Sequence, residues 1–169
     1  LAELSALCQQ HNAWLIVDDA HGFGLLGENG LGATRIANDI KIDAQLVTFG
    51  KAMGGQGAAI LGSQALIDFL VANARHYICS TALSPAHAVA ALAAINMMKQ
   101  QPERRQKLND NIACFRAACL EKNIELSDSQ TAIQPILIGD AAKTMAVAKR
   151  LKEHGFWLGA IRTPTVPVG

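Results

Sequence analysis

The sequence of 169 residues has almost no net charge, because its fifteen lysine and arginine residues are balanced by fourteen aspartate and glutamate residues. Proteins that bind nucleic acid or anionic membrane surfaces usually carry a clear basic excess. The sequence also lacks an apolar run near the roughly 20 residues that cross a bilayer, and no basic leader precedes an apolar segment. We therefore expect no nucleic-acid or membrane partner, and a small molecule as the ligand.

The four cysteines show no pairing pattern. They form no CxxC motif and have no metal-like spacing with histidine, and a chain of this length does not need disulfides to fold. Half of the residues are apolar, which is enough to build a buried core. We expect reduced cysteines, no metal site and a cytoplasmic protein. The cysteines are Cys8, Cys79, Cys114 and Cys119.

A starting methionine is also missing, and the first residues already have helical spacing without a capping residue before them. At the other end, the apolar residues of segment 165–169 have nothing after them in the sequence to pack against. We expect the chain to be a fragment that is cut at both ends.

The first part of the chain alternates helical and strand patterns, as an α/β layered domain requires. Helical periodicity is followed by short apolar runs that predict strands, the first two of them buried, and glycine-rich segments separate them. We expect this domain to span residues 1–102. Its predicted elements are a helix ending near residue 10, strands at 14–17, 44–49 and 58–61, and helices at about 64–74 and 85–100.

The character changes after Pro102. A charged helix is predicted at about 103–122 and another helix at 141–154, with strands at 132–138 and 156–161. We expect residues 103–169 to form a connecting helix and the start of a second, smaller α/β domain.

Two acids and a histidine follow the first predicted strand, in the run VDDAHG at residues 17–22. In open α/β sheets, ligands lie beyond the carboxyl ends of the strands, which is where Asp18 and His21 are placed. Aspartate is also favoured at helix caps and in turns, so a purely structural role stays open for this motif.

A lysine follows the second predicted strand, in the run VTFGK at residues 47–51. An isolated lysine at a strand end is usually a solvated surface residue. Together, the two motifs contain what a pyridoxal 5'-phosphate (PLP) site needs, namely an amine, a carboxylate for the pyridine nitrogen and a phosphate donor. Lys51, Asp18 and Thr48 would supply these groups, and His21 would reach the ring.

The two motifs, Ser80 and Thr81 before Pro85, and the string AIRTPTVP at 160–167 resemble the α-oxoamine synthases. The resemblance covers essentially the whole chain and implies the PLP-dependent transferase fold type I, also called aspartate-aminotransferase-like. The chain would comprise the C-terminal part of the large mixed-sheet domain and the start of the small domain.

The resemblance also implies a role for each matching residue. Lys51 would hold PLP as a Schiff base and move protons, Asp18 would pair with the pyridine nitrogen, and His21 would bind the phenolic oxygen. Thr48 would bind the phosphate. The two remaining predictions concern Ser80 with Thr81, which would reach the phosphate of a neighbouring subunit in a homodimer, and Arg162, which would bind the substrate carboxylate.

Within the family, the string around Arg162 resembles the member that condenses L-alanine with pimeloyl-CoA or a pimeloyl carrier protein, with loss of carbon dioxide, in biotin biosynthesis. Two alternatives stay open. One is a sister synthase that uses glycine, and the other is a folded chain without catalytic activity. In the family, residues that complete the cofactor pocket lie upstream of Leu1, so we expect the chain alone to be inactive.

Overall fold

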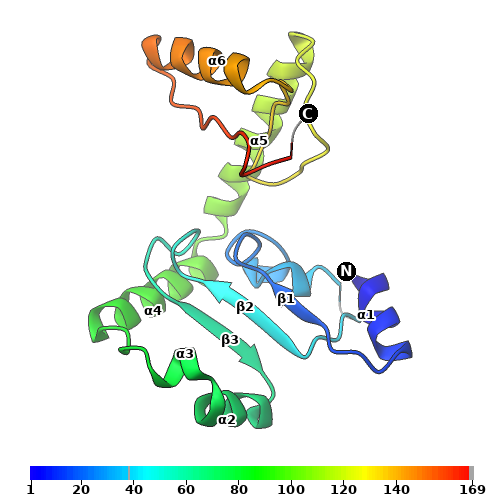
Figure 1. Ribbon diagram of the computed structural model, residues 1–169, viewed down its shortest axis with the longest axis vertical. Coiled ribbons are helices and arrows are strands. Elements are labelled where there is room, and N and C mark those ends of the chain that lie inside the picture. Colours follow the sequence, from blue (N-terminus) through cyan, green and yellow to red (C-terminus); the bar gives the residue numbers. More distant parts are fainter. Residues whose placement is uncertain (38, 168–169) are drawn as a thin grey trace. The chain divides into compact units, whose positions relative to one another are not determined.

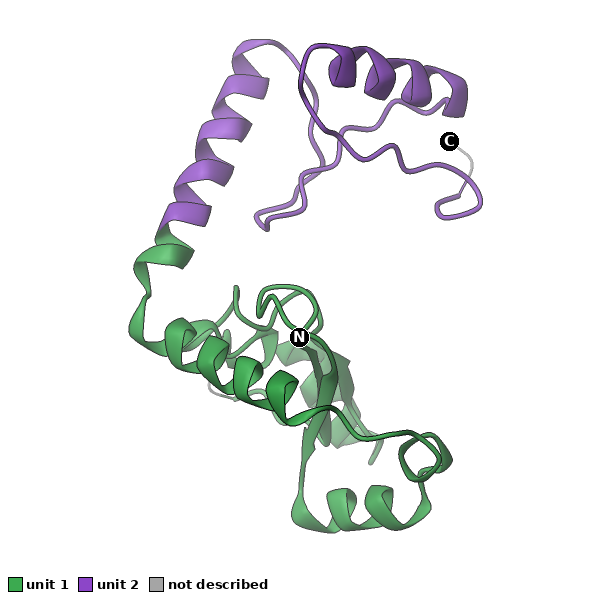
Figure 2. Cartoon of the chain, turned by 90° about the vertical axis from the view of Figure 1, so that its left-hand side faces the viewer, with its two compact units in different colours: residues 1–106 green, residues 107–169 purple. Residues whose placement is uncertain are grey.

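The computed structural model describes residues 1–37 and 39–167, so residues 168–169 of the second expected domain lie outside the described residues. The chain divides into two compact units, residues 1–106 and 107–169 (Figure 2). The division falls inside one long helix, α5 (Glu103–Glu121). The two domains expected from the sequence, with a boundary after residue 102, stay a prediction.

Unit 1 contains a three-stranded mixed sheet (Figure 1). Its strands are β1 (Ile16–Asp18), β2 (Ala44–Thr48) and β3 (Ala58–Gly62), in the spatial order β1-β2-β3. β1 and β2 are parallel, whereas β3 is antiparallel to β2. All three strands were predicted, although β1 starts two residues later than its apolar run.

The register of the sheet decides which side chains share a face. Asp18 pairs with Leu46 on β2, and Thr48 pairs with Ala58 on β3. Because successive side chains of a strand point to opposite faces, Asp18 and Thr48 belong to one face of the sheet. Gln45 and Val47 belong to the other face.

The hydrophobic core of unit 1 lies on the Val47 face. Val47 is 2% exposed and packs in one cluster with Phe23, Met53 and Met98. Met98 comes from α4 (Pro85–Gln100), so this helix covers the Val47 face. Ser84 caps α4 by accepting a hydrogen bond from the backbone N–H of His87, and Pro85 begins the helix, a position that needs no N–H donor.

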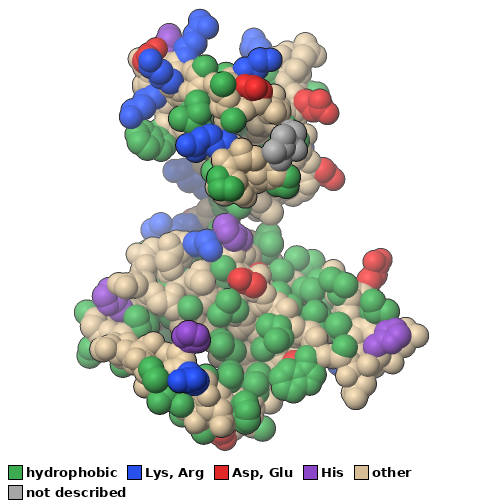
Figure 3. Space-filling model, viewed as in Figure 1, with side chains coloured by type: hydrophobic (Ala, Val, Ile, Leu, Met, Phe, Trp, Pro, Cys, Tyr) green, Lys and Arg blue, Asp and Glu red, His purple; other side chains and the backbone are tan. Residues whose placement is uncertain are grey.

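On the opposite face, side chains of the flanking strands β1 and β3 are exposed, whereas Ala44 of the central strand β2 is buried. Ile16 of β1 is 65% exposed and Ile60 of β3 is 46% exposed, and Figure 3 shows hydrophobic side chains gathered over unit 1 from this side. The prediction that residues 14–17 form a buried strand was therefore wrong in its burial, since Trp14 is 69% exposed as well. The reason is that β1 is an edge strand of the sheet that the described residues form.

The remaining helices of unit 1 are short. They are α1 (Ala2–Gln10), α2 (Gln64–Asn73), α3 (Arg75–Ile78) and two 3-10 turns, Glu28–Gly30 and Ala33–Arg35. Ser63 caps α2 by accepting a hydrogen bond of 3.2 Å from the backbone N–H of Leu66, whereas α1 starts at Leu1 without a side-chain cap.

Unit 2 contains the rest of α5 and helix α6 (Ala141–Glu153), which Asp140 caps through the backbone N–H of Lys143. Residues 132–138 and 156–161 were predicted as strands, and this was wrong, because the structure has no strand there. A strand needs a neighbour to satisfy its backbone groups, and neither segment has a paired strand within the described chain. Leu137 is 81% and Trp157 82% exposed as a result.

All four cysteines are free. Among the described residues, no helix combines the length and the apolar character that crossing a membrane would require.

Candidate cofactor site

The parallel pairing of β1 and β2 brings the two sequence motifs to one edge of the sheet. Asp18 is the last residue of β1, Thr48 is the last residue of β2, and the carboxyl ends of parallel strands meet at the same edge. The backbone N–H of Asp19 donates to the carbonyl of Leu46 at 2.8 Å and extends the pairing beyond Asp18. The edge that carries both motifs is therefore well ordered by backbone hydrogen bonds.

Asp18 and His21 lie in the tight turn that follows β1. The carboxylate of Asp18 accepts a hydrogen bond of 3.0 Å from the backbone N–H of Ala20, so the turn role considered for this motif is realised. Both side chains are nevertheless exposed at the sheet edge. The turn thus fixes the backbone of Asp18 and leaves the two polar groups accessible to a ligand.

Thr48 carries an unsatisfied polar atom. Its hydroxyl oxygen is buried and has no hydrogen-bond partner in the described part of the chain. Buried polar groups without a partner are rare, and leaving one costs about 1–3 kcal/mol. A phosphate oxygen would accept the missing hydrogen bond, so this residue fits the phosphate-binding role that the sequence predicts for it.

Lys51 is exposed in the loop between β2 and β3. Three backbone hydrogen bonds hold this loop: Phe49 N–H to the Gly57 carbonyl at 2.8 Å, Gly55 N–H to the Phe49 carbonyl at 2.7 Å, and Gly54 N–H to the Lys51 carbonyl at 3.0 Å. The lysine therefore projects from a fixed backbone three residues beyond Thr48.

Asp19 was assigned no role from the sequence, yet it is the most buried acid of unit 1, with 3% of its surface exposed. Its Oδ2 atom accepts hydrogen bonds from Gln45 Nε2 at 2.7 Å and from the Ala33 N–H at 2.8 Å. Burial is the main reason that its pKa is raised above the ordinary value of an aspartate. The signal that could have separated the two acids is the alternation of a strand, which lets only one of two neighbours face the site.

The other predicted residues belong to other segments of the chain. Ser80 and Thr81 are exposed in the segment between α3 and α4, where the hydroxyl of Ser80 donates to the carbonyl of His76. Arg162 is exposed in unit 2, in a turn that the Thr165 N–H closes onto the Arg162 carbonyl at 3.0 Å. Their roles toward a partner subunit and a substrate stay predictions.

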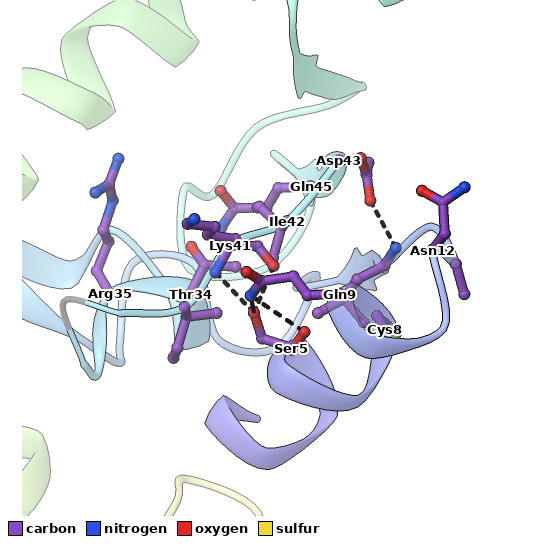
Figure 4. Close-up of a pocket in the computed structure, with 13 residues that line it drawn as sticks. Ser5, Cys8, Gln9, Asn12, Thr34, Arg35, Lys41, Ile42, Asp43 and Gln45 are labelled. Carbon is purple, nitrogen blue, oxygen red and sulfur yellow. Dashed lines mark hydrogen bonds between the residues drawn. The ribbon is translucent and has the colours of Figure 1, made fainter.

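A polar pocket of about 770 Å³ lies in a different part of unit 1 (Figure 4). It is lined by α1 and by the residues that precede β2, and Ser5 bridges these two parts by bonding both the N–H and the carbonyl of Lys41 at 2.8 Å. Asp43 and Leu15 place it at the amino ends of β1 and β2. The predicted site residues are not among the described residues of its lining, so this pocket is not the predicted cofactor site.

Comparison with known proteins finds relatives that match the whole chain. An 8-amino-7-oxononanoate synthase from Pectobacterium atrosepticum is 46% identical over 169 residues, which is all of this chain and 44% of that protein. The chain thus spans less than half the length of this curated relative.

Solved structures share the fold. The crystal structure of 8-amino-7-oxononanoate synthase from Francisella tularensis matches with a TM-score of 0.81 and 32% identity, over 96% of this chain and 50% of that one. A serine palmitoyltransferase from S. paucimobilis with a bound PLP–myriocin aldimine matches in fold with a TM-score of 0.92 and 24% identity, over 99% of this chain and 43% of that one. These matches confirm the expected α/β fold of the fold type I PLP enzymes.

A match to a family profile shows which protein family the chain belongs to. The profile described as aminotransferase class I and II matches residues 1–168. Because this match covers nearly every residue, the chain belongs to the class I and II aminotransferase family.

Proposed function

We propose that the protein carrying this chain condenses L-alanine with pimeloyl-CoA or a pimeloyl carrier protein, with loss of carbon dioxide, to 8-amino-7-oxononanoate in biotin biosynthesis. One observation carries the proposal: two motifs about thirty residues apart meet at one sheet edge, in a chain 46% identical to an 8-amino-7-oxononanoate synthase. The family uses PLP, which sets the chemistry to be expected at that edge.

Four residues would hold the cofactor. Lys51 would bind it through its amine, Asp18 would bind the pyridine nitrogen, His21 the phenolic oxygen and Thr48 the phosphate. The unpartnered hydroxyl of Thr48 and the accessible side chains at the sheet edge support this assignment. When bound, PLP withdraws electrons from the carbon that loses a proton or a carboxylate.

The protein's own groups would control where protons and charges lie. The carboxylate of Asp18 would hold a proton on the pyridine nitrogen, because a negative charge stabilises a protonated base beside it. The amine of Lys51 would take the α-proton of alanine, acting as a general base from a loop with a fixed backbone. Arg162 would bind the substrate carboxylate with two parallel N–H donors and orient it.

We also propose a cytoplasmic homodimer. Ser80 and Thr81 are exposed. Residues that bind the phosphate in a neighbouring subunit have to be accessible before the two subunits assemble, so this exposure supports the proposal. The free cysteines are compatible with a reducing compartment. The chain alone would be inactive, because it spans less than half of its relatives' length.

The decisive experiment is borohydride reduction of the full-length protein loaded with PLP, followed by peptide mapping. The pyridoxyl group is expected on Lys51, and the Lys51→Ala variant should lose it. Lys41→Ala is a matched control, since Lys41 is an exposed lysine of the same unit at the opposite end of β2. Labelling of any lysine other than Lys51 would overturn the site.

A substrate screen tests the reaction. The full-length protein is incubated with alanine, glycine or serine and with pimeloyl-CoA or acetyl-CoA, and products are identified by mass spectrometry. We expect 8-amino-7-oxononanoate from alanine and pimeloyl-CoA. A preference for glycine with acetyl-CoA would assign the protein to a sister synthase, and no product from any pair would favour a non-catalytic protein.

A further inference from the structure

The two neighbouring acids after β1 differ sharply in their surroundings. Asp18 is exposed, whereas Asp19 is 3% exposed and turns toward the Gln45 side of the sheet. The backbone of Asp19 is itself part of the sheet edge, through its N–H bond to the Leu46 carbonyl at 2.8 Å. Asp19 is therefore next to Asp18 in the sheet edge, but its side chain points to the face of the sheet opposite to that of Asp18.

The side chain of Asp19 joins three parts of unit 1. Its Oδ2 atom accepts one hydrogen bond from the middle of β2, through Gln45 at 2.7 Å, and one from Ala33, fourteen residues further along the chain, at 2.8 Å. Gln45 also donates to the carbonyl of Leu31 at 3.3 Å. The carboxylate therefore anchors the far end of the loop that follows β1 to the central strand.

The loop leaves no spare room around this carboxylate. A Cβ atom added to Gly22 would lie 2.0 Å from Asp19 Oδ1, and one added to Gly32 would lie 1.8 Å from Oδ2. Gly32 also has a φ of +102°, which side-chain-bearing residues rarely adopt. Both ends of the loop thus pack directly on the same side chain.

The near end of the loop is the turn that carries the cofactor groups. The N–H groups of Gly22 and Phe23 donate to the Asp19 carbonyl at 3.0 and 2.9 Å, which places His21 inside this turn. A shift of Asp19 would therefore move the backbone of both Asp18 and His21.

We propose that Asp19 is a positioning residue, whose carboxylate holds the loop of residues 22–35 against β2 and thereby fixes Asp18 and His21 for the cofactor. The part of this inference that concerns the cofactor rests on the proposed function, whereas the anchoring of the loop by Asp19 does not. Asparagine in its place retains an oxygen that can accept both hydrogen bonds, whereas alanine retains none. The role therefore depends on the accepting oxygen and not on the charge.

The test compares Asp19→Ala, Asp19→Asn and Asp18→Asn with the wild type in the full-length protein. Two quantities are measured: the dissociation constant of PLP by absorbance titration, and the exchange rate of the Ala33 N–H without PLP. For Asp19→Ala we expect a dissociation constant about tenfold higher or more, because small displacements of binding groups are costly. The Ala33 exchange rate should rise by about tenfold or more as its acceptor is lost.

The control variants separate the two acids. Asp19→Asn should stay within about threefold of the wild type in both quantities, since its oxygen can accept both bonds. Asp18→Asn should weaken PLP binding and leave the Ala33 exchange rate unchanged. If Asp19→Ala does not fold, Gln45→Ala removes one of the two donors and should show a smaller change in the same direction.

Three outcomes would overturn the inference. They are wild-type PLP affinity in Asp19→Ala, unchanged Ala33 exchange in that variant, and an Asp19→Asn variant as impaired as Asp19→Ala, which would assign the effect to charge. A wild-type protein that binds no PLP would instead overturn the proposed function, and the positioning role with it, even if the Ala33 exchange rate still revealed the anchor.

Discussion

Gln45 Nε2 donates a hydrogen bond of 2.7 Å to Asp19 Oδ2, and both residues are buried, with 7% and 3% of their surfaces exposed. They are 26 residues apart in the sequence and meet because β1 and β2 are parallel neighbours. The bond stabilises the ionised carboxylate, but burial acts more strongly in the opposite direction, and the pKa of Asp19 is raised as a result.

The raised pKa of Asp19 predicts a pH dependence of stability. The folded protein keeps this proton at pH values where the unfolded chain has lost it, so protonation of Asp19 stabilises the fold. Its contribution is fully present below about pH 4 and is lost as the pH rises through the raised pKa of the folded state. Urea unfolding across this range should show it as a difference in free energy between the wild type and Asp19→Asn. A difference that shifts in favour of the wild type with rising pH would contradict this.

Gly32→Ala should destabilise the protein by about 2 kcal/mol or more. The backbone at this position has a positive φ that alanine rarely adopts, and the new Cβ would clash with Asp19. Gly54→Ala is the matched control, since Gly54 also has a positive φ, of +61°, but has nothing within 4 Å of an added Cβ. It should cost about 1 kcal/mol. Equal losses in the two variants, measured by denaturant unfolding, would argue against close packing on the Asp19 carboxylate.

Thr48→Val should separate cofactor binding from stability. Removing the unpartnered hydroxyl should leave the PLP-free protein as stable as the wild type or up to about 1 kcal/mol more stable, since a buried unsatisfied group is lost. PLP affinity should fall, while Thr48→Ser should retain it. Unfolding without PLP and titration with PLP check the two parts, and undiminished affinity in Thr48→Val would exclude Thr48 as a phosphate ligand.

Lys51→Ala should leave the free energy of unfolding of the PLP-free protein within about 0.5 kcal/mol of the wild type, because the side chain is exposed. Met98→Ala should cost about 2–5 kcal/mol, because Met98 is buried in the core beside Val47. Thermal or denaturant unfolding of both variants checks the contrast. A large loss in Lys51→Ala would indicate that the lysine supports the fold and is not held available for a ligand.

Most helices could be predicted from the sequence because the signals that start them are local. Ser84 caps α4 and Pro85 is its first residue, and the observed range of Pro85–Gln100 matches the prediction. The strands β2 and β3 also lie where they were expected. Strand predictions failed at residues 132–138 and 156–161, because an apolar run becomes a strand only when a neighbouring strand satisfies its backbone. The exposure of Ile16 could not be foreseen either, since burial depends on what packs on a face.

The candidate site divides in the same way. The sequence by itself determined the chemistry on offer, because Lys51, Asp18, His21 and Thr48 are residue types that a PLP site requires, and they follow recognisable strand patterns. Only the tertiary structure decided that the two motifs share a sheet edge, that the Thr48 hydroxyl is buried without a partner, and that Asp19 turns away to anchor a loop. These features arise from strand pairing and from hydrogen bonds that join residues far apart in the sequence, by 14 positions in one bond and by 26 in the other. No local sequence pattern specifies such contacts.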